Sequence, residues 1–573
     1  MQTEPKFRTL IDLFNESLVG IERMDKECLT IVRSDRQESL TFEQLKVKAR
    51  DFAVWLIRSA GIQIGDRVAI LGENRADWDV ALWGVVLAGG IPVLIDPDRT
   101  VESVTNHVTH TETRLIVMAD DYQDDDSRRE LKESASNQDI ALIEMTVYDK
   151  IGLGEPETKE LLGKIPGEIQ PEKAAVILCT SATTGDPREV ELTHANLGTN
   201  LQGSVKKIDI SAADTLGHIL PPHHSFGFTV GKLLPFCVGA ANVYTNKFRE
   251  IGELIRDKKV TIFVAVPALF TVLAKNVEER LTKQKQEKPY LKLLDRHVPK
   301  QVGKGIIKKL GWDKIRFFLS GSAPMPKWVL DVFWRRGLPL YEGYGTTENS
   351  PVYGFNDNVQ GLGSVGKPID TMFVKIVDDK EQTLGAGEKG EIALGGPCIM
   401  KGYYKNAEAT EAVIRTDDKG VRWLLTGDLG HLDKNGNLHI TGRKKYVIVL
   451  PGGKNVNPER VESALLQASL VAEILVVPGF WKDSTGIEQE TVRAIVRPAW
   501  DMIESQGPHS PEDLRNEPKL LKNILWQSIN ECQQKSRQLS GYEKISSQHL
   551  EIRIEEFQKT STGKIKREVY MKM

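Results

Sequence analysis

Five short stretches, far apart in the chain, hold the residues best suited to chemistry on a phosphate. The first, CTSATTGDPRE (179–189), follows the apolar run AAVILC and offers four hydroxyls and a glycine. Hydroxyls and backbone N–H groups at the end of a strand can surround an anion. The stretch lacks the GKS or GKT ending of a P-loop, and Glu189 places a negative charge beside it. It could bind a phosphate or be a simple Ser/Thr-rich turn.

The other four stretches add an aromatic ring, carboxylates and cations. YEGYGTTE (341–348) could stack a base, hydrogen-bond a phosphate and, through Glu348, ligate magnesium. Asp428 in TGD lies in a tight turn, from which a carboxylate can accept both hydroxyls of a ribose, and GRKK (442–445) brings cations soon after it. Lys564 lies in the glycine-containing stretch KTSTGKIKR. Each stretch alone could be a core turn or a surface loop, so only their combination points to a function.

The elements that must position these stretches alternate between helix and strand. Residues 40–61 have apolar side chains at helical spacing, and short apolar runs follow them, namely RVAIL, IPVLI, LIVMA, AAVILC, TIFVAVP and IRFFLS. This pattern predicts an α/β fold of mostly parallel sheets covered by helices. From about residue 370, strands between Gly-rich turns predict a β-rich subdomain. We expect an N-terminal domain of residues 1–443 that includes this subdomain (370–443), and a small, mobile α+β domain of residues 444–573.

The composition is that of a globular protein and excludes several classes. Of the 573 residues, 40% are hydrophobic and 27% are charged, and the net charge of −3 gives no sign of a nucleic-acid partner. The five cysteines are scattered, which favours a reducing compartment. The N-terminus lacks a signal-peptide pattern, and the longest apolar run (80–95) is broken by glycines and a proline. We expect a cytoplasmic protein with at most peripheral membrane contact. The basic stretch 303–314 could touch a membrane surface, but we expect it to lead into the next strand.

Two further patterns fail on their context. GLGSVG (361–366) matches a dinucleotide-binding fingerprint, but Pro368 follows where a helix should begin. Histidines occur at positions 218, 223 and 224, and His107 lies three residues before His110. No carboxylate or cysteine stands at ligand spacing to complete a zinc set with them. We therefore expect neither a dinucleotide site nor metal binding by these histidines.

In their order and spacing, the five stretches together resemble the adenylate-forming superfamily of acyl-CoA synthetases, luciferases and peptide-synthetase adenylation domains. The resemblance covers nearly the whole chain, from LTFEQL and GDRVAILGENRADW to KTSTGKIKR. It implies that the stretch 179–189 grips ATP. The residues that would hold the β- and γ-phosphates are Thr180, Ser181, Thr183, Thr184, Gly185 and Arg188. Those that would surround the AMP moiety are Ser322, Ala323, Pro324, Tyr344, Gly345, Thr346, Asp428 and Arg443, with Asp428 on the ribose.

The resemblance also implies the catalytic residues and the cofactors. Lys564 would bridge the substrate carboxylate and the α-phosphate, Thr347 would touch that phosphate, and Glu348 would hold magnesium. His224 in LPPHHSFG is a fourth catalytic candidate. Lys445 would mark a hinge, and Gly452 and Gly453 would approach coenzyme A. The implied reaction has two steps: a carboxylate attacks MgATP to give an acyl adenylate, and a thiol then displaces AMP. Because Lys564 must leave before the thiol enters, one site would be served by a rotating domain.

The segment LPPHHSFGFTVGKLLPFCVG (220–239), called the acid segment below, indicates which class of carboxylic acid is the substrate. Adenylation domains for amino acids carry an aspartate there, and this segment has no acidic residue, so a buried ammonium would lack a partner. The sequence motifs of the chain look closest to those of bacterial medium- to long-chain fatty acyl-CoA synthetases. This resemblance implies a fatty acid or another hydrophobic carboxylic acid as substrate. Two alternatives within the class stay open, namely loading of an acyl carrier protein and an aryl-CoA ligase.

The phosphate stretch departs from the family pattern in three places. Where this chain has Ala182, Arg188 and Glu189, the family usually has glycine, lysine and glycine. A fourth departure lies outside the stretch, at Gln558, where the family usually has proline. These departures motivate an alternative of another class, a catalytically impaired, nucleotide-binding pseudoenzyme. Because neighbouring side chains on a strand face opposite sides, we expect Arg188 to face the phosphates and Glu189 to point away from them.

Overall fold

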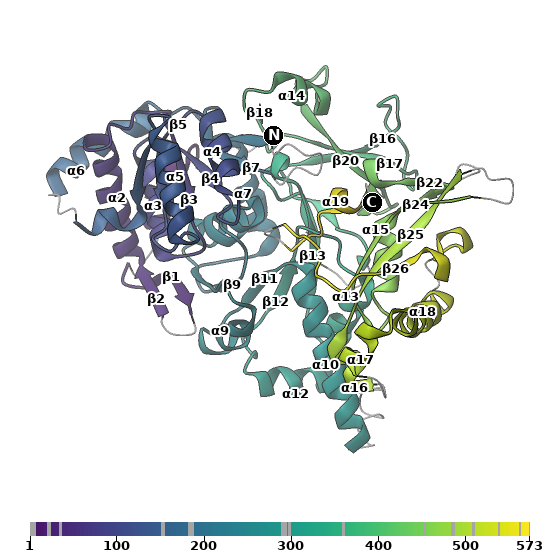
Figure 1. The fold of residues 1–573 in the computed structure, drawn as a ribbon. Helices are drawn as coiled ribbons and strands as arrows, with labels where there is room; N and C mark the ends of the chain where they lie inside the picture. Colours follow the sequence, from purple (N-terminus) through teal and green to yellow (C-terminus); the bar gives the residue numbers. More distant parts are fainter. Residues whose placement is uncertain are drawn as a thin grey trace. The chain divides into compact units, whose positions relative to one another are not determined.

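The computed structural model describes most of the chain. The described residues are 7–19, 24–33, 37–150, 155–180, 188–287, 295, 299–357, 361–450, 454–482, 488–506, 510–536, 539–560 and 563–571. By their contacts, the residues form two compact units. The first unit contains residues 1–182, 186–374 and 393–425, and the second contains residues 183–185, 375–392 and 426–573. Figure 1 shows the elements of both units.

A nine-stranded sheet lies in the first unit. Its strands, from edge to edge, are β15 (Lys367–Pro368), β14 (Gly354–Asn356), β13 (Leu340–Tyr344), β12 (Phe317–Ser320), β11 (Ile262–Ala265), β9 (Thr215–His218), β10 (Ala241–Tyr244), β1 (Glu27–Val32) and β2 (Gln37–Thr41). The strands from β13 to β1 pair in parallel. Phe263, Phe270, Phe318 and Phe333 pack edge to face in the core between this sheet and the helices α10 (Pro267–Glu287) and α13 (Lys327–Arg335). Every residue of β11 is buried, as expected for a strand covered on both faces.

A seven-stranded sheet in the same unit carries the phosphate stretch. Its strands, in order, are β18 (Gly402–Tyr403), β8 (Glu189–Thr193), β7 (Ala174–Cys179), β4 (Ile91–Ile95), β3 (Arg67–Leu71), β5 (Thr113–Met118) and β6 (Ala141–Glu144). The five strands from β7 to β6 are parallel, whereas β8 runs antiparallel to β7. The helices around this sheet are α2 (Phe42–Arg58), α3 (Ala76–Leu87), α4 (Val101–His110), α5 (Asp125–Ser136) and α7 (His194–Ile208), as Figure 1 shows.

The predicted β-rich region forms a five-stranded sheet. Its strands are β16 (Phe373–Val377), β17 (Gly390–Gly395), β20 (Arg422–Leu432) and β19 (Ile414–Thr416), with β21 (Leu438–Arg443) beside β20. The pairing of β20 with β21 is antiparallel and sets Asp428 opposite Arg443. This register matters because both residues are candidates for the nucleotide site.

The rest of the second unit is a small α+β assembly. Its strands are β22 (Ile448–Leu450), β23 (Lys454–Val456), β24 (Val471–Lys482), β25 (Glu488–Pro498) and β26 (Leu550–Ile552). Apolar side chains from these strands, from α15 (Pro458–Leu465) and from α18 (Pro518–Lys535) share one core. The chain closes with α19 (Arg567–Met571), directly after the Lys564 stretch. The other α-helices are α1 (Leu10–Val19), α6 (Glu155–Leu162), α8 (Leu234–Cys237), α9 (Ile251–Asp257), α12 (Pro299–Leu310), α14 (Ala407–Val413), α16 (Trp500–Gln506) and α17 (Pro511–Asn516).

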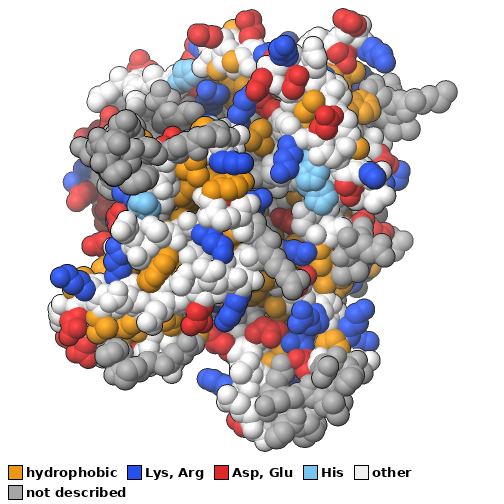
Figure 2. Space-filling model, turned by 90° about the vertical axis from the view of Figure 1, so that its right-hand side faces the viewer, with side chains coloured by type: hydrophobic (Ala, Val, Ile, Leu, Met, Phe, Trp, Pro, Cys, Tyr) orange, Lys and Arg blue, Asp and Glu red, His pale blue; other side chains and the backbone are white. Residues whose placement is uncertain are grey.

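The predicted fold class is confirmed: parallel sheets covered by helices, a β-rich region and a small C-terminal α+β part. The domain boundary at 443/444 stays a prediction, since the contacts group residues 375–392 and 426–443 with the C-terminal elements. Acidic and basic side chains are interspersed on the face in Figure 2, in keeping with the net charge of −3. Among the described helices, none is long and apolar enough to cross a bilayer.

Candidate active site

The phosphate stretch is closed at its base by two strand ends. β7 ends at Cys179 and β8 begins at Glu189, and these two residues face each other in the antiparallel register. The backbone N–H and the Oγ1 hydroxyl of Thr180 both donate to the carbonyl oxygen of Arg188, at 2.9 and 3.0 Å. These bonds bring two of the predicted phosphate residues together. The other candidates, Ser181, Thr183, Thr184 and Gly185, lie outside the described residues, as does Ala182.

Arg188 and Glu189 contact different groups, as their alternation along the chain predicted. The Arg188 guanidinium lies over the ring of Tyr403, 4.9 Å from its centroid. The buried Glu189 carboxylate instead contacts His107 Nδ1 at 2.7 Å and His110 Nδ1 at 3.2 Å. Burial works to raise the pKa of Glu189, but the hydrogen bond and charge of His107, together with His110, outweigh it and lower that pKa. The carboxylate is therefore ionised and held by histidines.

Tyr403 links Arg188 to the YGTTE stretch. Its hydroxyl donates to Glu348 Oε1 at 3.0 Å, while its ring lies beneath the Arg188 guanidinium. Burial, and then the nearby Glu348 carboxylate, raise the pKa of Tyr403, so the phenol keeps the proton that it donates. Thr347 Oγ1 lies 2.9 Å from Ser225 Oγ, so the LPPHHSFG segment meets the same stretch. Three of the candidate segments thus converge within the first unit.

The backbone of YGTTE leaves little room for substitution. A side chain at Gly345 would place its Cβ 1.5 Å from the carbonyl oxygen of Pro351, so only glycine fits there. Thr346 caps the short helical turn Thr347–Asn349 that presents Glu348. Oxygen is the ligand type that magnesium requires, and Glu348 presents a half-buried carboxylate whose Oε1 accepts the Tyr403 hydroxyl. The residues present therefore fit a magnesium ion.

The adenine candidates lie at the ends of neighbouring parallel strands. β12 and β13 pair in parallel, so SGSAP after β12 and YGTTE at the end of β13 share one sheet edge. Tyr344 packs edge to face on Tyr353 at 5.7 Å. Ser322 and Ala323 are half-buried and Pro324 is exposed. His224, also half-buried, accepts a hydrogen bond at Nδ1 from the Phe226 N–H at 3.3 Å. Each of these positions is accessible in part, as binding would require.

A buried carboxyl group lies under this edge. Glu342 on β13 accepts the backbone N–H of Met325 at 2.8 Å. Burial raises its pKa to about 7, with the Met325 hydrogen bond acting in the opposite direction. Its charged form is therefore unfavourable in the folded state, so ionisation of Glu342 above pH 7 costs folding stability.

The second unit brings Asp428, Arg443 and Lys564 together. Asp428 is buried and its Oδ1 lies 3.0 Å from Arg443 Nε, in agreement with their pairing across β20 and β21. Gly427 before it has φ of +71°, a conformation suited to glycine. Surrounding protein, and then Arg443, lower the pKa of Lys564 to about 8, while Asp428 and Glu459 raise it. The Lys564 side chain is exposed to solvent.

The predicted hinge lysine is bonded within the second unit. Lys445 Nζ lies 3.1 Å from Glu568 Oε1 on α19, and the Tyr446 hydroxyl contacts the same carboxylate. The two glycines predicted to approach coenzyme A, Gly452 and Gly453, lie outside the described residues.

Three residues at the site carried no role in the sequence analysis: Tyr403, Ser225 and Glu459. Tyr403 belongs to the short strand β18, and Ser225 belongs to LPPHHSFG, in which only His224 was a candidate. Glu459 lies in the first turn of α15, and burial, followed by the charge of Glu462, raises its pKa. Only the fold shows that they lie beside the candidates.

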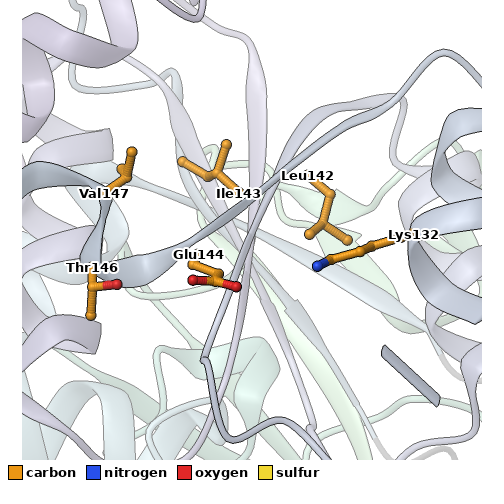
Figure 3. A pocket seen from close by; sticks show the side chains of 6 residues that line it. All are labelled: Lys132, Leu142, Ile143, Glu144, Thr146 and Val147. Atoms are coloured by element: carbon orange, nitrogen blue, oxygen red, sulfur yellow. The ribbon is translucent and has the colours of Figure 1, made fainter. Parts of the chain in front are cut away.

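A surface pocket elsewhere does not involve the site. It measures about 270 Å³ and lies at β6, and Figure 3 shows the side chains that line it. They are Lys132, Leu142, Ile143, Glu144, Thr146 and Val147. None of them is a candidate site residue, so we assign this pocket no part in the chemistry.

Comparison with known proteins places this arrangement in a family. Residues 21–404 match the family model described as AMP-binding enzyme. The chain belongs to this family. A long-chain-fatty-acid–CoA ligase of Escherichia coli O157:H7 is 25% identical over 98% of this chain and 94% of its own length. A long-chain-fatty-acid–CoA ligase of Bacillus subtilis is 30% identical over 80% of this chain and 81% of its own.

Solved structures agree on the fold of this AMP-binding enzyme. The o-succinylbenzoate coenzyme A synthetase of Bacillus subtilis, in complex with ATP and magnesium, superposes with a TM-score of 0.72 at 22% identity, over 97% of this chain and 98% of that one. The predicted family is thereby confirmed, and the chain is an adenylate-forming ligase that joins a carboxylic acid to a thiol.

Proposed function

We propose that this AMP-binding enzyme converts a medium- or long-chain fatty acid, through an acyl adenylate, into an acyl-CoA thioester, with release of AMP and pyrophosphate. The observation that carries the proposal is the acid segment, 220–239, which supplies no carboxylate. All residues of its π-helical part, Gly227–Leu233, are buried, and its one lysine, Lys232, is paired with Asp79 at 2.8 Å. The Asp79 carboxylate also accepts the hydroxyl of Tyr244, so it is not available to hold a substrate ammonium.

In the first half-reaction, a carboxylate oxygen of the acid attacks the α-phosphorus of ATP, the bond to pyrophosphate breaks, and the acyl adenylate forms. The acid and the triphosphate repel each other, so cations must neutralise charge as it moves. Arg188 would hold the departing phosphates, and Lys564 would bridge the acid and the α-phosphate. Glu348, oriented by Tyr403, would hold magnesium, which supplies Lewis-acid stabilisation of phosphoryl oxygens when bound.

In the second half-reaction, the thiol sulfur attacks the acyl carbon, the carbon–oxygen bond to AMP breaks, and the thioester and AMP form. Lys564 would contribute only to the first transition state, so the C-terminal domain would move about Lys445 between the two steps. Coenzyme A is the proposed thiol, and the phosphopantetheine of an acyl carrier protein is the acceptor to be tested against it.

A substrate screen tests the proposal. Pyrophosphate release would be measured with acids from acetate to palmitate and with benzoate, and the product would be assayed with coenzyme A and with holo acyl carrier protein. We expect the highest activity with a medium- or long-chain acid and coenzyme A. Lys564→Ala should abolish most of it, and Lys566→Ala, an exposed lysine two residues further on, should not. Highest activity with benzoate, or transfer to the carrier protein alone, would contradict the proposal.

A further inference from the structure

Four side chains meet beside the phosphate stretch in a cluster that the ligase reaction does not use. His107 and His110 come from the last turn of α4, Cys179 ends β7, and Glu189 begins β8. The register of β7 and β8 sets Cys179 opposite Glu189, so both side chains lie on the face of the sheet where α4 presents its histidines. Ligand spacing along the chain predicts no metal site at these histidines, because Cys179 and Glu189 lie 72 and 82 residues from His107.

We propose that His107, Cys179 and Glu189 form a binding site for a divalent transition-metal cation, with zinc as the ion that this ligand set suits best. One ligand atom from each of the three residues lies within 4.8 Å of the other two. Imidazole nitrogen, thiolate sulfur and carboxylate oxygen are the three donors that zinc takes in proteins. A set of three protein ligands is typical of sites that leave the fourth position to water.

One ligand spacing matches that of a tetrahedral site, and a second is shorter than it. Ligands at about 2.0 Å for nitrogen and about 2.3 Å for sulfur lie about 3.5 Å apart across a tetrahedral angle. His107 Nδ1 and Cys179 Sγ are 3.6 Å apart. His107 Nδ1 and Glu189 Oε1, at 2.7 Å, share a hydrogen bond and would separate by about 0.6 Å to reach the corresponding spacing. A small side-chain adjustment therefore makes room for the ion.

The charges also balance. The ion would take the lone pair of His107 Nδ1, so the ring would keep its proton on Nε2, and the Cys179 thiol would release its proton to solvent. The thiolate and the Glu189 carboxylate together would carry two negative charges, which a divalent cation cancels. His107 Nε2 is buried and has no hydrogen-bond partner among the described residues, so the change of tautomer breaks no bond there.

The surroundings would hold the ligands in place and let the ion in. Cys179 packs against the apolar core that includes Val104, Val108 and Ile177, which fixes the sulfur. The second oxygen of Glu189 stays bonded to His110 Nδ1 at 3.2 Å, as carboxylate ligands usually are. The His110 side chain is 46% exposed, which gives the site an approach from solvent. A bound ion would join α4 to both strand ends at the base of the phosphate stretch.

A cobalt titration of the full chain, freed of metal with a chelator, tests the proposal. Tetrahedral cobalt bound to a thiolate gives a sulfur-to-cobalt charge-transfer band in the near ultraviolet and strong visible bands. We expect both bands to saturate at one equivalent and zinc to displace them. Cys179→Ser should remove the charge-transfer band, and His107→Gln should weaken cobalt binding at least tenfold.

Matched cysteine variants control for the other thiols. Cys237→Ser and Cys532→Ser, in which half-buried cysteines outside the cluster are replaced, should keep the full spectrum. The cobalt titration of the wild-type protein tests for the metal site even if a variant fails to fold. A wild-type protein without the charge-transfer band, or a band that survives Cys179→Ser, overturns the proposal and leaves a hydrogen-bonded cluster only.

Discussion

Glu189→Gln separates the two places where the Glu189 charge could act, namely on the histidines or on the phosphates of ATP. In the structure, the Glu189 carboxylate oxygens lie 2.7 Å from His107 Nδ1 and 3.2 Å from His110 Nδ1. A hydrogen bond to a charged group contributes about 1.5–3 kcal/mol and a neutral one about 0.5–1.5 kcal/mol. The variant keeps the shape and loses the charge, so we expect the metal-free protein to lose about 1–3 kcal/mol of unfolding free energy at pH 7.

The pH dependence of this loss follows from the lowered pKa of Glu189. A carboxyl group with a lowered pKa in the folded state contributes stability above its unfolded pKa of about 4.3, and the contribution disappears as pH falls through the folded value. Urea unfolding with a chelator present should therefore show a gap between wild type and variant at pH 7 that closes in acid. Glu191→Gln is the control, because that carboxylate pairs with the half-exposed Lys401 at 2.7 Å and should cost less than about 1 kcal/mol.

ATP affinity provides the second readout. If Glu189 faced the phosphates at about 4 Å, each charge pair would cost about 1 kcal/mol in water-like screening and about 4 kcal/mol at an effective dielectric of about 20. Since the carboxylate is held by histidines, Glu189→Gln should change the Kd for ATP by less than about tenfold, or 1.4 kcal/mol. A hundredfold tightening would refute the reasoning, since it would mean that the glutamate repels the nucleotide.

Three further variants test other parts of the account. Lys564→Ala should slow adenylation far more than thioester formation from supplied acyl adenylate, and equal losses in single-turnover assays of the two steps would refute its role. Asp428→Ala should raise the Kd for ATP at least about tenfold, because two ribose hydrogen bonds of about 1.5–3 kcal/mol each are lost, and an unchanged Kd in calorimetry would count against the assignment. Glu342→Gln should stabilise the protein by up to about 3 kcal/mol at pH 8 and hardly at all at pH 4. The reason is that the folded state raises the pKa of Glu342 to about 7, so the wild-type protein loses folding free energy as the pH rises from the pKa of the unfolded carboxyl group to 7. A thermal-unfolding series that shows the gain only in acid would contradict this.

The sequence predicted the elements well where a local pattern determines them. RVAIL and IPVLI are β3 and β4 with the same bounds, and the helical pattern over 40–61 is α2, Phe42–Arg58. Their apolar periodicity reports the burial of each element directly. The alternation of Arg188 and Glu189 likewise follows from the strand that they enter, and the structure gives the two side chains separate partners.

Contacts across long separations could not be predicted in the same way. The bond from Tyr403 to Glu348 and the meeting of His107 with Cys179 and Glu189 depend on how sheets pair and where α4 packs. Ligand spacing along the chain reveals only residues that are neighbours in sequence, so it gives no sign of this cluster. The pairing of Asp428 with Arg443 could be predicted more easily, because both residues belong to one antiparallel pair of neighbouring strands.

Fatty-acid-dependent exchange of labelled pyrophosphate into ATP isolates the proposed adenylation step, because it needs only the acid, ATP and magnesium and reports the first half-reaction alone. We expect a medium- or long-chain fatty acid to stimulate exchange well above the rate with acetate or an amino acid. Lys564→Ala should abolish this exchange, and Lys566→Ala should retain it. Wild-type protein that binds ATP yet shows no exchange with any fatty acid would contradict the account.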